Sequence, residues 1–253
     1  MKYMGSKSRI AKRILPIILE GRKDGQYYVE PFCGGCNMID KVPGNRIAND
    51  GNPYLIAMWE ALSWGWDPPK IIDREHYCEV RKCYNQNTDE YPMHYIGWVG
   101  FVGSYNGRFF DGGYAGSSVM TSSGTVRDYI GEAARNILDQ VPLIDGVQFT
   151  NQSYADMIIP PNSIIYCDPP YEGVKKYSYS IDHEKFWAWC RERVAEGHKA
   201  FVSEYNAPDD FVCIWDQELK TTMNPDTTKR AVEKLFIHKS QLKNIEYERI
   251  EFI

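Results

Sequence analysis

Four consecutive residues in the second half of the chain combine a carboxylate, two prolines and an aromatic ring: Asp168, Pro169, Pro170 and Tyr171. They follow the apolar run 164–167, whose length and composition predict a short, fully buried strand of a parallel sheet. The prolines end that strand because they remove backbone donors and fix φ. In open α/β sheets, ligands bind at the carboxyl ends of strands. We therefore expect residues 168–171 to line a functional site.

The chemistry that suits these four residues is transfer to an exocyclic amino group on a flat base. Such a nitrogen is a poor nucleophile because its lone pair is delocalised into the ring. A site must therefore hold both hydrogens and direct the lone pair at an electrophile. The Asp168 carboxylate and a proline carbonyl can accept the two hydrogens, while the Tyr171 ring stacks on the base. The alternative is an ordinary Pro-Pro turn that Asp168 caps.

A second informative segment covers residues 27–37, where a β-rich run ends in an acid and continues into a glycine pair. The glycines allow a backbone to approach a ligand closely. The segment lacks the glycine spacing of a dinucleotide fingerprint and the Lys-Ser/Thr ending of a phosphate-binding loop. Asp50 ends another short strand, where ribose hydroxyls would lie. A nucleoside ligand without phosphate indicates S-adenosylmethionine, held in part by Glu30, Pro31, Phe32, Gly34 and Gly35.

Four motifs, at residues 2–7, 30–35, 49–52 and 168–171, occur in the order typical of Dam-type adenine-N6 DNA methyltransferases of bacteria and their phages. Residues 229–236 also resemble that family's basic turn leading into a late strand, so the resemblance spans nearly the whole chain. It implies that residues 168–171 engage the target adenine. It also implies a cofactor site contributed by Tyr3, Lys7, Asp50 and Asp168.

The order of strands, turns and helices predicts an α/β fold, a Rossmann-like S-adenosylmethionine-dependent methyltransferase sheet. We expect strands at 27–30, 46–49, 147–150, 163–167, 199–203, 211–222 and 234–238, and helices at 53–62, at 182–196 and from a Ser6 or Ser8 cap to about Leu19, bent or interrupted at Pro16. Between 63 and 145, aromatic residues and helical fragments replace this rhythm. The sequence therefore predicts a discontinuous catalytic domain, 1–62 and 146–253, with an inserted, mostly helical target-recognition domain at 63–145 that binds DNA.

Inside that insertion, residues 103–124 have few charges and many glycines, which predicts a long loop without regular structure. Arginine pairs with guanine, and asparagine with adenine, through two hydrogen bonds each. The segment loosely resembles the base-reading loop of the family at residues 105–108 and departs from it afterwards. The resemblance of the whole chain to the family implies a short target containing GATC. The alternative is a mobile surface loop packed by its own aromatic residues. The residues that we expect to contact bases are Tyr105, Asn106 and Arg108.

The formal charge of −5 argues against a generally sticky nucleic-acid binder, because phosphate attraction normally requires a basic surface. The distribution matters more, since seven basic side chains but one acid lie within residues 1–23. The alternative is that these residues form ordinary solvated helix faces. The basic residues that we expect to contact DNA are Lys12, Arg13, Lys229 and Arg230.

Seven cysteines at irregular spacing are expected to be reduced. Cys33 and Cys36 have the spacing of half a zinc site, but Cys78 and Cys83 complement it poorly and no histidine is placed to substitute, so we expect no metal. No apolar run approaches the ~18 residues of a membrane span, and no apolar signal region is visible. We therefore expect a cytoplasmic protein, in a bacterium or a phage-infected host, without a membrane partner, as a monomer or weak dimer.

The reaction expected from these features is direct transfer of a methyl group from S-adenosylmethionine to N6 of adenine in double-stranded DNA. The adenine must be flipped out, because its amino group is not otherwise accessible. Catalysis would rest on positioning and on a dry polar pocket, without a covalent enzyme intermediate. Two alternatives stay open: amino methylation of RNA or of a protein glutamine, where Asn usually replaces Asp168, and an inactive DNA-binding relative. The intact motif at 168–171, together with Asp50, argues against inactivity.

Overall fold

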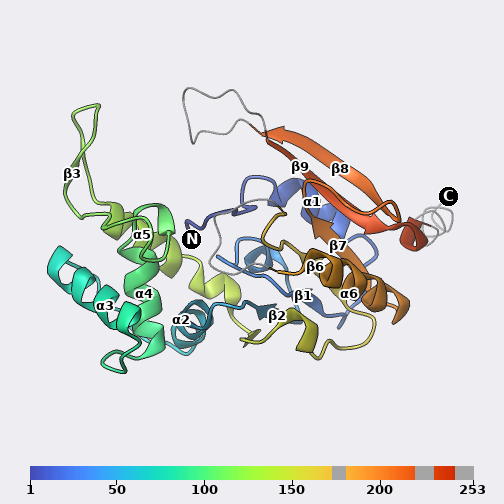
Figure 1. Cartoon of the computed structure of the whole chain (residues 1–253), viewed down its shortest axis with the longest axis horizontal. Coiled ribbons are helices and arrows are strands. Elements are labelled where there is room, and N and C mark those ends of the chain that lie inside the picture. The colour runs from blue at the N-terminus through green and yellow to red at the C-terminus, as the bar shows by residue number, and fades with distance from the viewer. Residues whose placement is uncertain (173–180, 220–230, 243–253) are drawn as a thin grey trace. The chain divides into compact units, whose positions relative to one another are not determined.

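The computed structural model describes residues 1–172, 181–219 and 231–242 as a mixed α/β fold (Figure 1). Within these ranges, seven strands form one sheet in the order β5-β2-β1-β6-β7-β9-β8. The expected α/β class is thereby confirmed. The strands are β1 Tyr28–Glu30, β2 Arg46–Asn49, β5 Val147–Thr150, β6 Ile164–Cys167, β7 Lys199–Ser203, β8 Phe211–Leu219 and β9 Ala231–His238.

The central strands are parallel and buried. β1 pairs with β6, and β6 with β7, in parallel registers that match Val29 to Ile165 and Ile165 to Ala200. Every residue of β1 and β6 is buried. Strands covered on both faces consist of continuous apolar runs, which is why these short segments were predictable from composition.

Strand β9 changes the direction of the sheet. It pairs antiparallel with β7, matching Leu235 to Ser203, and antiparallel with β8 along most of its length. Because β9 runs against β7, its first residues lie beside the carboxyl end of β7. The strand predicted at 234–238 is therefore too short at its amino end, because β9 begins at Ala231. For the strand predicted at 211–222, residues 220–222 lie outside the described residues.

The helices begin where side chains or burial favour them. Asn52 caps α2 by accepting hydrogen bonds from two backbone N–H groups, with Pro53 at the first helical position, and Asp182 caps α6. The predicted Ser6 or Ser8 cap of the first helix is wrong, because that helix begins three residues after Ser8. The helices are α1 Ala11–Ile18, α2 Pro53–Ser63, α3 Arg74–Gln86, α4 Met93–Val102, α5 Tyr129–Leu138 and α6 His183–Ala195.

Helix α1 follows its buried face rather than a capping side chain. Ile10 occupies the cap position without a side-chain hydrogen bond, and Ala11 and Ile14 are fully buried. Pro16 lies inside this helix, which continues past it to Ile18 and is therefore not interrupted there, while a bend at Pro16 stays a prediction. Ser6 Oγ accepts a hydrogen bond from the backbone N–H of Ser8 instead of capping the helix.

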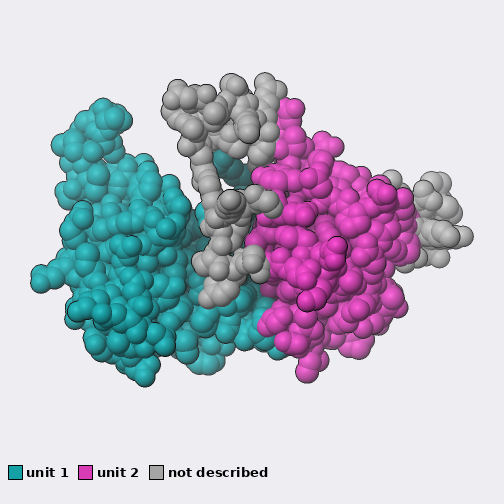
Figure 2. Space-filling view, viewed as in Figure 1, with its two compact units in different colours: residues 1–9, 33–43, 48–152 teal, residues 10–32, 44–47, 153–253 magenta. Residues whose placement is uncertain are grey.

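The chain divides into two compact units (Figure 2). Unit 1 contains residues 1–9, 33–43 and 48–152, and unit 2 contains residues 10–32, 44–47 and 153–253. This division differs from the sequence-based one, and a recognition domain at 63–145 stays a prediction. Helices α3, α4 and α5 all lie within that predicted range.

Unit 1 has an aromatic core between its helices. The Phe109 ring stacks on Tyr54 at 5.6 Å between ring centroids and lies 4.8 Å from the Phe101 ring. Phe110 is buried and stacks on Tyr84 at 5.3 Å. The long unstructured loop expected at 103–124 is therefore wrong in part, because its aromatic residues join the core. The segment also contains a 3₁₀ turn, Tyr105–Gly107, and strand β3 of a short hairpin, Val119–Met120 with β4 Val126–Arg127.

Helix α4 packs closely on α2. A Cβ added at Gly97 would overlap the carbonyl oxygen of Tyr54 on α2, so only glycine fits there without displacement. Trp59 on α2 and Trp98 on α4 are fully buried. Two apolar helices with a small residue at their crossing thus provide the rigid part of unit 1.

In unit 2, helix α6 packs against the sheet (Figure 1). Phe186 and Cys190 are fully buried against sheet residues that include Ile165 and Val202. Of the seven cysteines, five are buried, whereas Cys78 and Cys213 are exposed. Among the residues that the structure describes, no helix has both the length and the apolar character needed to cross a bilayer.

Candidate functional site

In unit 1, the predicted cofactor residue Asp50 follows the last residue of β2 and is half-buried. Its Oδ2 accepts the backbone N–H of Gly34 at 3.0 Å, and its Oδ1 accepts that of Asn52 at 2.9 Å. Burial raises the pKa of Asp50, and the two N–H groups oppose that shift. The carboxylate thus connects the glycine loop with the start of α2. An ionised carboxylate has about four acceptor sites, so it retains capacity for ligand hydroxyls.

The glycine pair accommodates the side chain of Tyr3. A Cβ at Gly34 would lie 2.6 Å from the Tyr3 ring, and a Cβ at Gly35 would lie 2.8 Å from Tyr3 Cβ. Gly34 also has a positive φ of 46°, which disfavours other residues. The sequence predicts that these glycines allow the approach of a ligand, and in the structure the Tyr3 side chain occupies the space beside them. Tyr3, Gly34, Gly35 and Asp50 are nevertheless brought together, as predicted.

The glycine loop is held by two residues that the sequence analysis missed. Trp59 Nε1 donates to Gly34 O at 3.3 Å. The buried Gln140 donates through Nε2 to Gly35 O at 3.0 Å and to Cys36 O at 2.9 Å. Gln140 is 105 positions away from Gly35, so no local pattern could have identified it. These bonds fix the loop before any ligand binds.

Lys7 is buried, with 6% of its surface exposed, and its Nζ donates to Gly5 O at 3.0 Å. A lysine is rarely buried without a structural or functional partner. The burial of Lys7, the last residue of the motif at 2–7, is compatible with a cofactor role and argues against a contact with DNA phosphate. Lys12 and Arg13, in contrast, are exposed on α1.

In unit 2, the motif at 168–171 follows strand β6 directly, as predicted. Asp168 is half-buried and Pro169 is buried. The Tyr171 hydroxyl donates to Glu233 Oε2 at 2.9 Å, and its ring lies 4.6 Å from the Tyr205 ring at 80°. Burial, together with the nearby carboxylates of Asp168 and Glu233, raises the pKa of Tyr171 well above its ordinary value. Tyr171 is therefore a neutral phenol whose hydroxyl donates a hydrogen bond to the Glu233 carboxylate.

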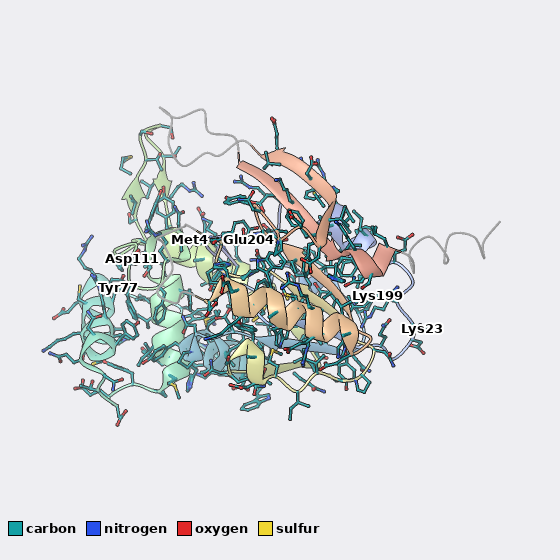
Figure 3. All side chains as sticks on the ribbon, turned by 45° about the vertical axis from the view of Figure 1, so that its right-hand side comes forward. Met4, Lys23, Tyr77, Asp111, Lys199 and Glu204 are labelled. Carbon is teal, nitrogen blue, oxygen red and sulfur yellow. The ribbon has the colours of Figure 1, made fainter. Side chains whose placement is uncertain are left out.

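A further carboxylate, Glu204, lies immediately after β7 and is 2% exposed. Its Oε1 accepts the backbone N–H of Glu172 at 2.8 Å, and its Oε2 accepts the N–H of Tyr205. Burial raises the pKa of Glu204, against the effect of these two N–H groups. Figure 3 labels Glu204 near the start of α6, where His183 Nδ1 lies 3.9 Å from Glu204 Oε1. Glu204 was missed, although an acid after a predicted strand is the signal that identified Asp50 and Asp168.

Glu30, the last residue of β1, is 2% exposed and accepts the Tyr28 hydroxyl at 2.9 Å. Burial first, and then Glu30, raises the pKa of Tyr28 well above its ordinary value. Glu30, Asp168 and Glu204 thus stand at the carboxyl ends of three neighbouring parallel strands. Unit 2 carries a row of carboxylates along this edge of its sheet.

The next predicted cofactor residues contribute to packing. The Phe32 ring lies 5.3 Å from the Tyr154 ring and 5.8 Å from the Phe186 ring, next to the core of unit 2. Pro31 separates Phe32 from Glu30 in the chain. A direct cofactor contact by Pro31 or Phe32 stays a prediction.

A pocket of roughly 380 Å³ lies next to the motif in unit 2. Its volume is in the range of small-molecule sites, roughly 300–1,000 Å³. An indole, an amide, an imidazole and two carboxylates face it, which are groups that stack on or hydrogen-bond a planar ring. The lining residues are Glu172, His183, Glu184, Trp187, Arg191, Asn206, Ala207 and Pro208.

The residues expected to read bases are on the surface of unit 1. Tyr105 and Asn106 are exposed, and Asn106 has a positive φ of 56° inside the 3₁₀ turn. Arg108 is exposed and pairs with Asp111, also exposed, at 2.8 Å between Nη2 and Oδ2. Exposure is necessary for base contacts, but the contacts themselves stay a prediction. The predicted basic pair Lys229 and Arg230 lies outside the described residues.

Comparison with known protein families gives one match in the first part of the chain. Residues 3–96 match the model of the D12 class N6 adenine-specific DNA methyltransferases. This match supports the resemblance to the Dam-type family. S-adenosylmethionine is the cofactor that this class implies. In the described part of the chain, no group of three or more His, Cys, Asp or Glu side chains could hold a metal ion.

Among the similar solved structures is the crystal structure of SMU.472, a methyltransferase complexed with SAH. Its sequence is 13% identical and its TM-score is 0.33, over 92% of this chain and 53% of that chain. The present chain therefore spans about half the length of that protein.

Proposed function

We propose that the protein is an S-adenosylmethionine-dependent methyltransferase that methylates N6 of adenine in double-stranded DNA. The observation that carries the proposal is the motif at 168–171, which follows a buried parallel strand with its aspartate half-buried and its tyrosine hydrogen-bonded to a carboxylate. The family match over residues 3–96 supports adenine as the acceptor.

Unit 1 supplies the residues proposed to hold the cofactor. Asp50 retains acceptor capacity for ribose hydroxyls, next to a loop that Trp59 and Gln140 fix in place. Tyr3 lies against this loop and Lys7 is buried in the adjoining segment. The donor set therefore fits a nucleoside without phosphate. When bound, S-adenosylmethionine supplies an electrophilic methyl group on a positively charged sulfur.

Unit 2 supplies the residues proposed to act on the acceptor. Asp168 Oδ and the Pro169 carbonyl would each accept one amino hydrogen of adenine, which directs the nitrogen lone pair at the methyl group. Tyr171 would contact the base. The amino nitrogen gains positive charge as its bond to the methyl carbon forms, and fixed carboxylates stabilise such a charge. The row of Glu30, Asp168 and Glu204 provides them, and the excess proton leaves afterwards to solvent.

Adenine inside a duplex cannot reach such a site, so the proposal includes extrusion of the base from the helix. The pocket next to the motif has the volume and the lining for a planar ring, with Trp187 and Asn206 as candidate contacts. Tyr105, Asn106 and Arg108 are proposed to read neighbouring bases. Lys12, Arg13, Lys229 and Arg230 are proposed to contact phosphate.

The proposal is tested by offering labelled S-adenosylmethionine with duplex DNA, RNA or a glutamine peptide, and by mapping modified bases in the product. We expect label at adenine N6 of DNA. Asp168→Ala should reduce single-turnover transfer at least ~100-fold while the variant stays folded and still binds DNA. Asp156→Ala removes an exposed acid from the same unit and should leave transfer unchanged.

Three outcomes would contradict the proposal. Transfer to RNA or to the peptide but not to DNA would assign a different acceptor. DNA binding without transfer to any acceptor would indicate an inactive relative. Transfer by Asp168→Ala within a few-fold of the unaltered protein would remove Asp168 from the chemistry.

A further inference from the structure

Two carboxylates hold the end of the motif by direct hydrogen bonds. Glu233 accepts the Tyr171 hydroxyl at 2.9 Å, and Glu204 accepts the next backbone N–H, of Glu172, at 2.8 Å. We propose that Glu233 is a positioning residue that fixes the orientation of the Tyr171 ring, while Glu204 fixes the backbone behind it. This inference rests on the proposed function, because it concerns how the same site presents its aromatic ring to the acceptor.

The sheet topology explains why Glu233 reaches this position. β9 pairs antiparallel with β7 and matches Leu235 to Ser203, the last residue of β7. Glu233 lies two positions before Leu235, so it extends past the carboxyl end of β7 on the same face of the sheet as Leu235. Tyr171 follows the neighbouring strand β6 at that edge. A parallel β9 would have placed its first residues at the opposite edge.

The chemistry of the contact favours orientation. The Tyr171 hydroxyl donates to Glu233 Oε2, so this contact fixes the direction of the O–H bond. Bonds from hydroxyl to carboxylate are among the stronger neutral-to-charged hydrogen bonds. The Tyr205 ring meets the Tyr171 ring nearly perpendicularly, at 80°, which adds a lateral contact. Hydroxyl and ring are thus both restrained before an acceptor arrives.

Glu204 restrains the backbone at the same place. It is 2% exposed and accepts two successive groups, the N–H of Glu172 from the motif and the N–H of Tyr205 from its own loop. The residue after Tyr171 and the residue that packs on Tyr171 are therefore tied to one buried carboxylate. Together, Glu204 and Glu233 couple the motif to β7, which lies beside β6, and to β9, the next strand after β7 in the sheet.

The experiment compares Glu233→Gln, Tyr171→Phe and the double variant in single-turnover methyl transfer to DNA. Each single variant should slow transfer about 10-fold, the scale of one hydrogen bond to a charged group. The double variant should be no slower than the slower single variant, because both remove the same bond. Cofactor affinity should not change. Asp216→Asn, an exposed acid on the adjacent strand β8, is the matched control and should transfer at the unaltered rate.

A second readout is independent of activity. In protein labelled with ¹³C-tyrosine, the ring resonance that is absent from Tyr171→Phe belongs to Tyr171, and Glu233→Gln should shift it while Asp216→Asn should not. If Glu233→Gln does not fold, Glu233→Asp is used in its place. Glu233→Asp should slow transfer in the otherwise unaltered protein, but should cause no further loss of rate when it is combined with Tyr171→Phe.

The outcomes separate this inference from the proposed function. An unaltered protein that transfers no methyl group to DNA would overturn the proposed function. Losses that multiply in the double variant of an active protein, or a Tyr171 resonance insensitive to Glu233→Gln, would overturn the positioning role alone.

Discussion

Asp50 provides the sharpest test of the proposed cofactor site. Asp50→Ala removes both acceptors, so the N–H groups of Gly34 and Asn52, at 3.0 Å and 2.9 Å, lose their partner. It also removes the carboxylate proposed to accept ribose hydroxyls. A hydrogen bond to a charged group contributes about 1.5–3 kcal/mol. We therefore expect S-adenosylmethionine to bind about 10- to 150-fold more weakly.

The pH dependence follows from the direction of the pKa shift. Burial raises the pKa of Asp50 above its ordinary value of about 3.9. Protonation removes an acceptor, so cofactor affinity should fall as the pH falls through this raised pKa. The folding stability should move in the opposite sense, because the native state holds the proton more tightly than the unfolded chain. That contribution is present at low pH and is lost as the pH rises through the folded pKa.

Calorimetric titration with S-adenosylmethionine, repeated across a pH series, measures both effects, and thermal unfolding verifies the fold. Asp73→Ala is the control, because Asp73 Oδ1 caps α3 by accepting the His76 N–H at 2.8 Å in the same unit. It should lower stability by about 1 kcal/mol without changing cofactor affinity. A folded Asp50→Ala with unaltered affinity would exclude Asp50 from the site.

Two further predictions concern stability. Gly97→Ala should lower the free energy of unfolding by about 1–3 kcal/mol, because the added Cβ would overlap Tyr54 O. Gly51→Ala is the control: its Cβ would meet nothing within 4 Å, so the free energy of unfolding should change little. Equal urea midpoints for the two variants would contradict the prediction. The hydrogen bonds from Arg191, at 2.6 Å and 2.8 Å, lower the pKa of Asp210 to about 2. These hydrogen bonds stabilise the folded protein above the unfolded pKa of about 3.9, and that stabilisation is lost as the pH falls towards 2. The free energy of unfolding of Asp210→Asn should therefore depend less steeply on pH between about 3.9 and 2 than that of the unaltered protein. Superimposable acid-unfolding curves would refute the second prediction.

The buried strands were predictable because burial on both faces leaves a continuous apolar run, as in residues 164–167. The start of α1 was not predictable from local sequence. Ser6 and Ser8 have the side chains of good helix caps, but the burial of Ala11 and Ile14 determines where the helix forms. Segment 103–124 was misjudged for a similar reason. Its aromatic residues pack on α2, α3 and α4, and such contacts have no local signature.

The residues of the candidate site also include some that the sequence identifies and some that only the folded chain identifies. Asp50 and Asp168 were identifiable because each follows a recognisable strand, and Glu204 carried that signal without being noticed. Gln140 and Glu233 act across 105 and 62 positions of sequence, so only the folded chain identifies them.

The two exposed cysteines have a practical use. Cys78 lies on α3 in unit 1, and Cys213 lies on β8 in unit 2, while the other five are buried. Thiol-reactive fluorophores should therefore attach to one position on each unit of the unaltered protein. Both positions belong to regular elements, so a dye there would follow its unit. Energy transfer between the two dyes would then report whether the distance between them changes when cofactor or DNA is added. The variants Cys78→Ser and Cys213→Ser, each with one remaining exposed cysteine, provide the singly labelled reference samples.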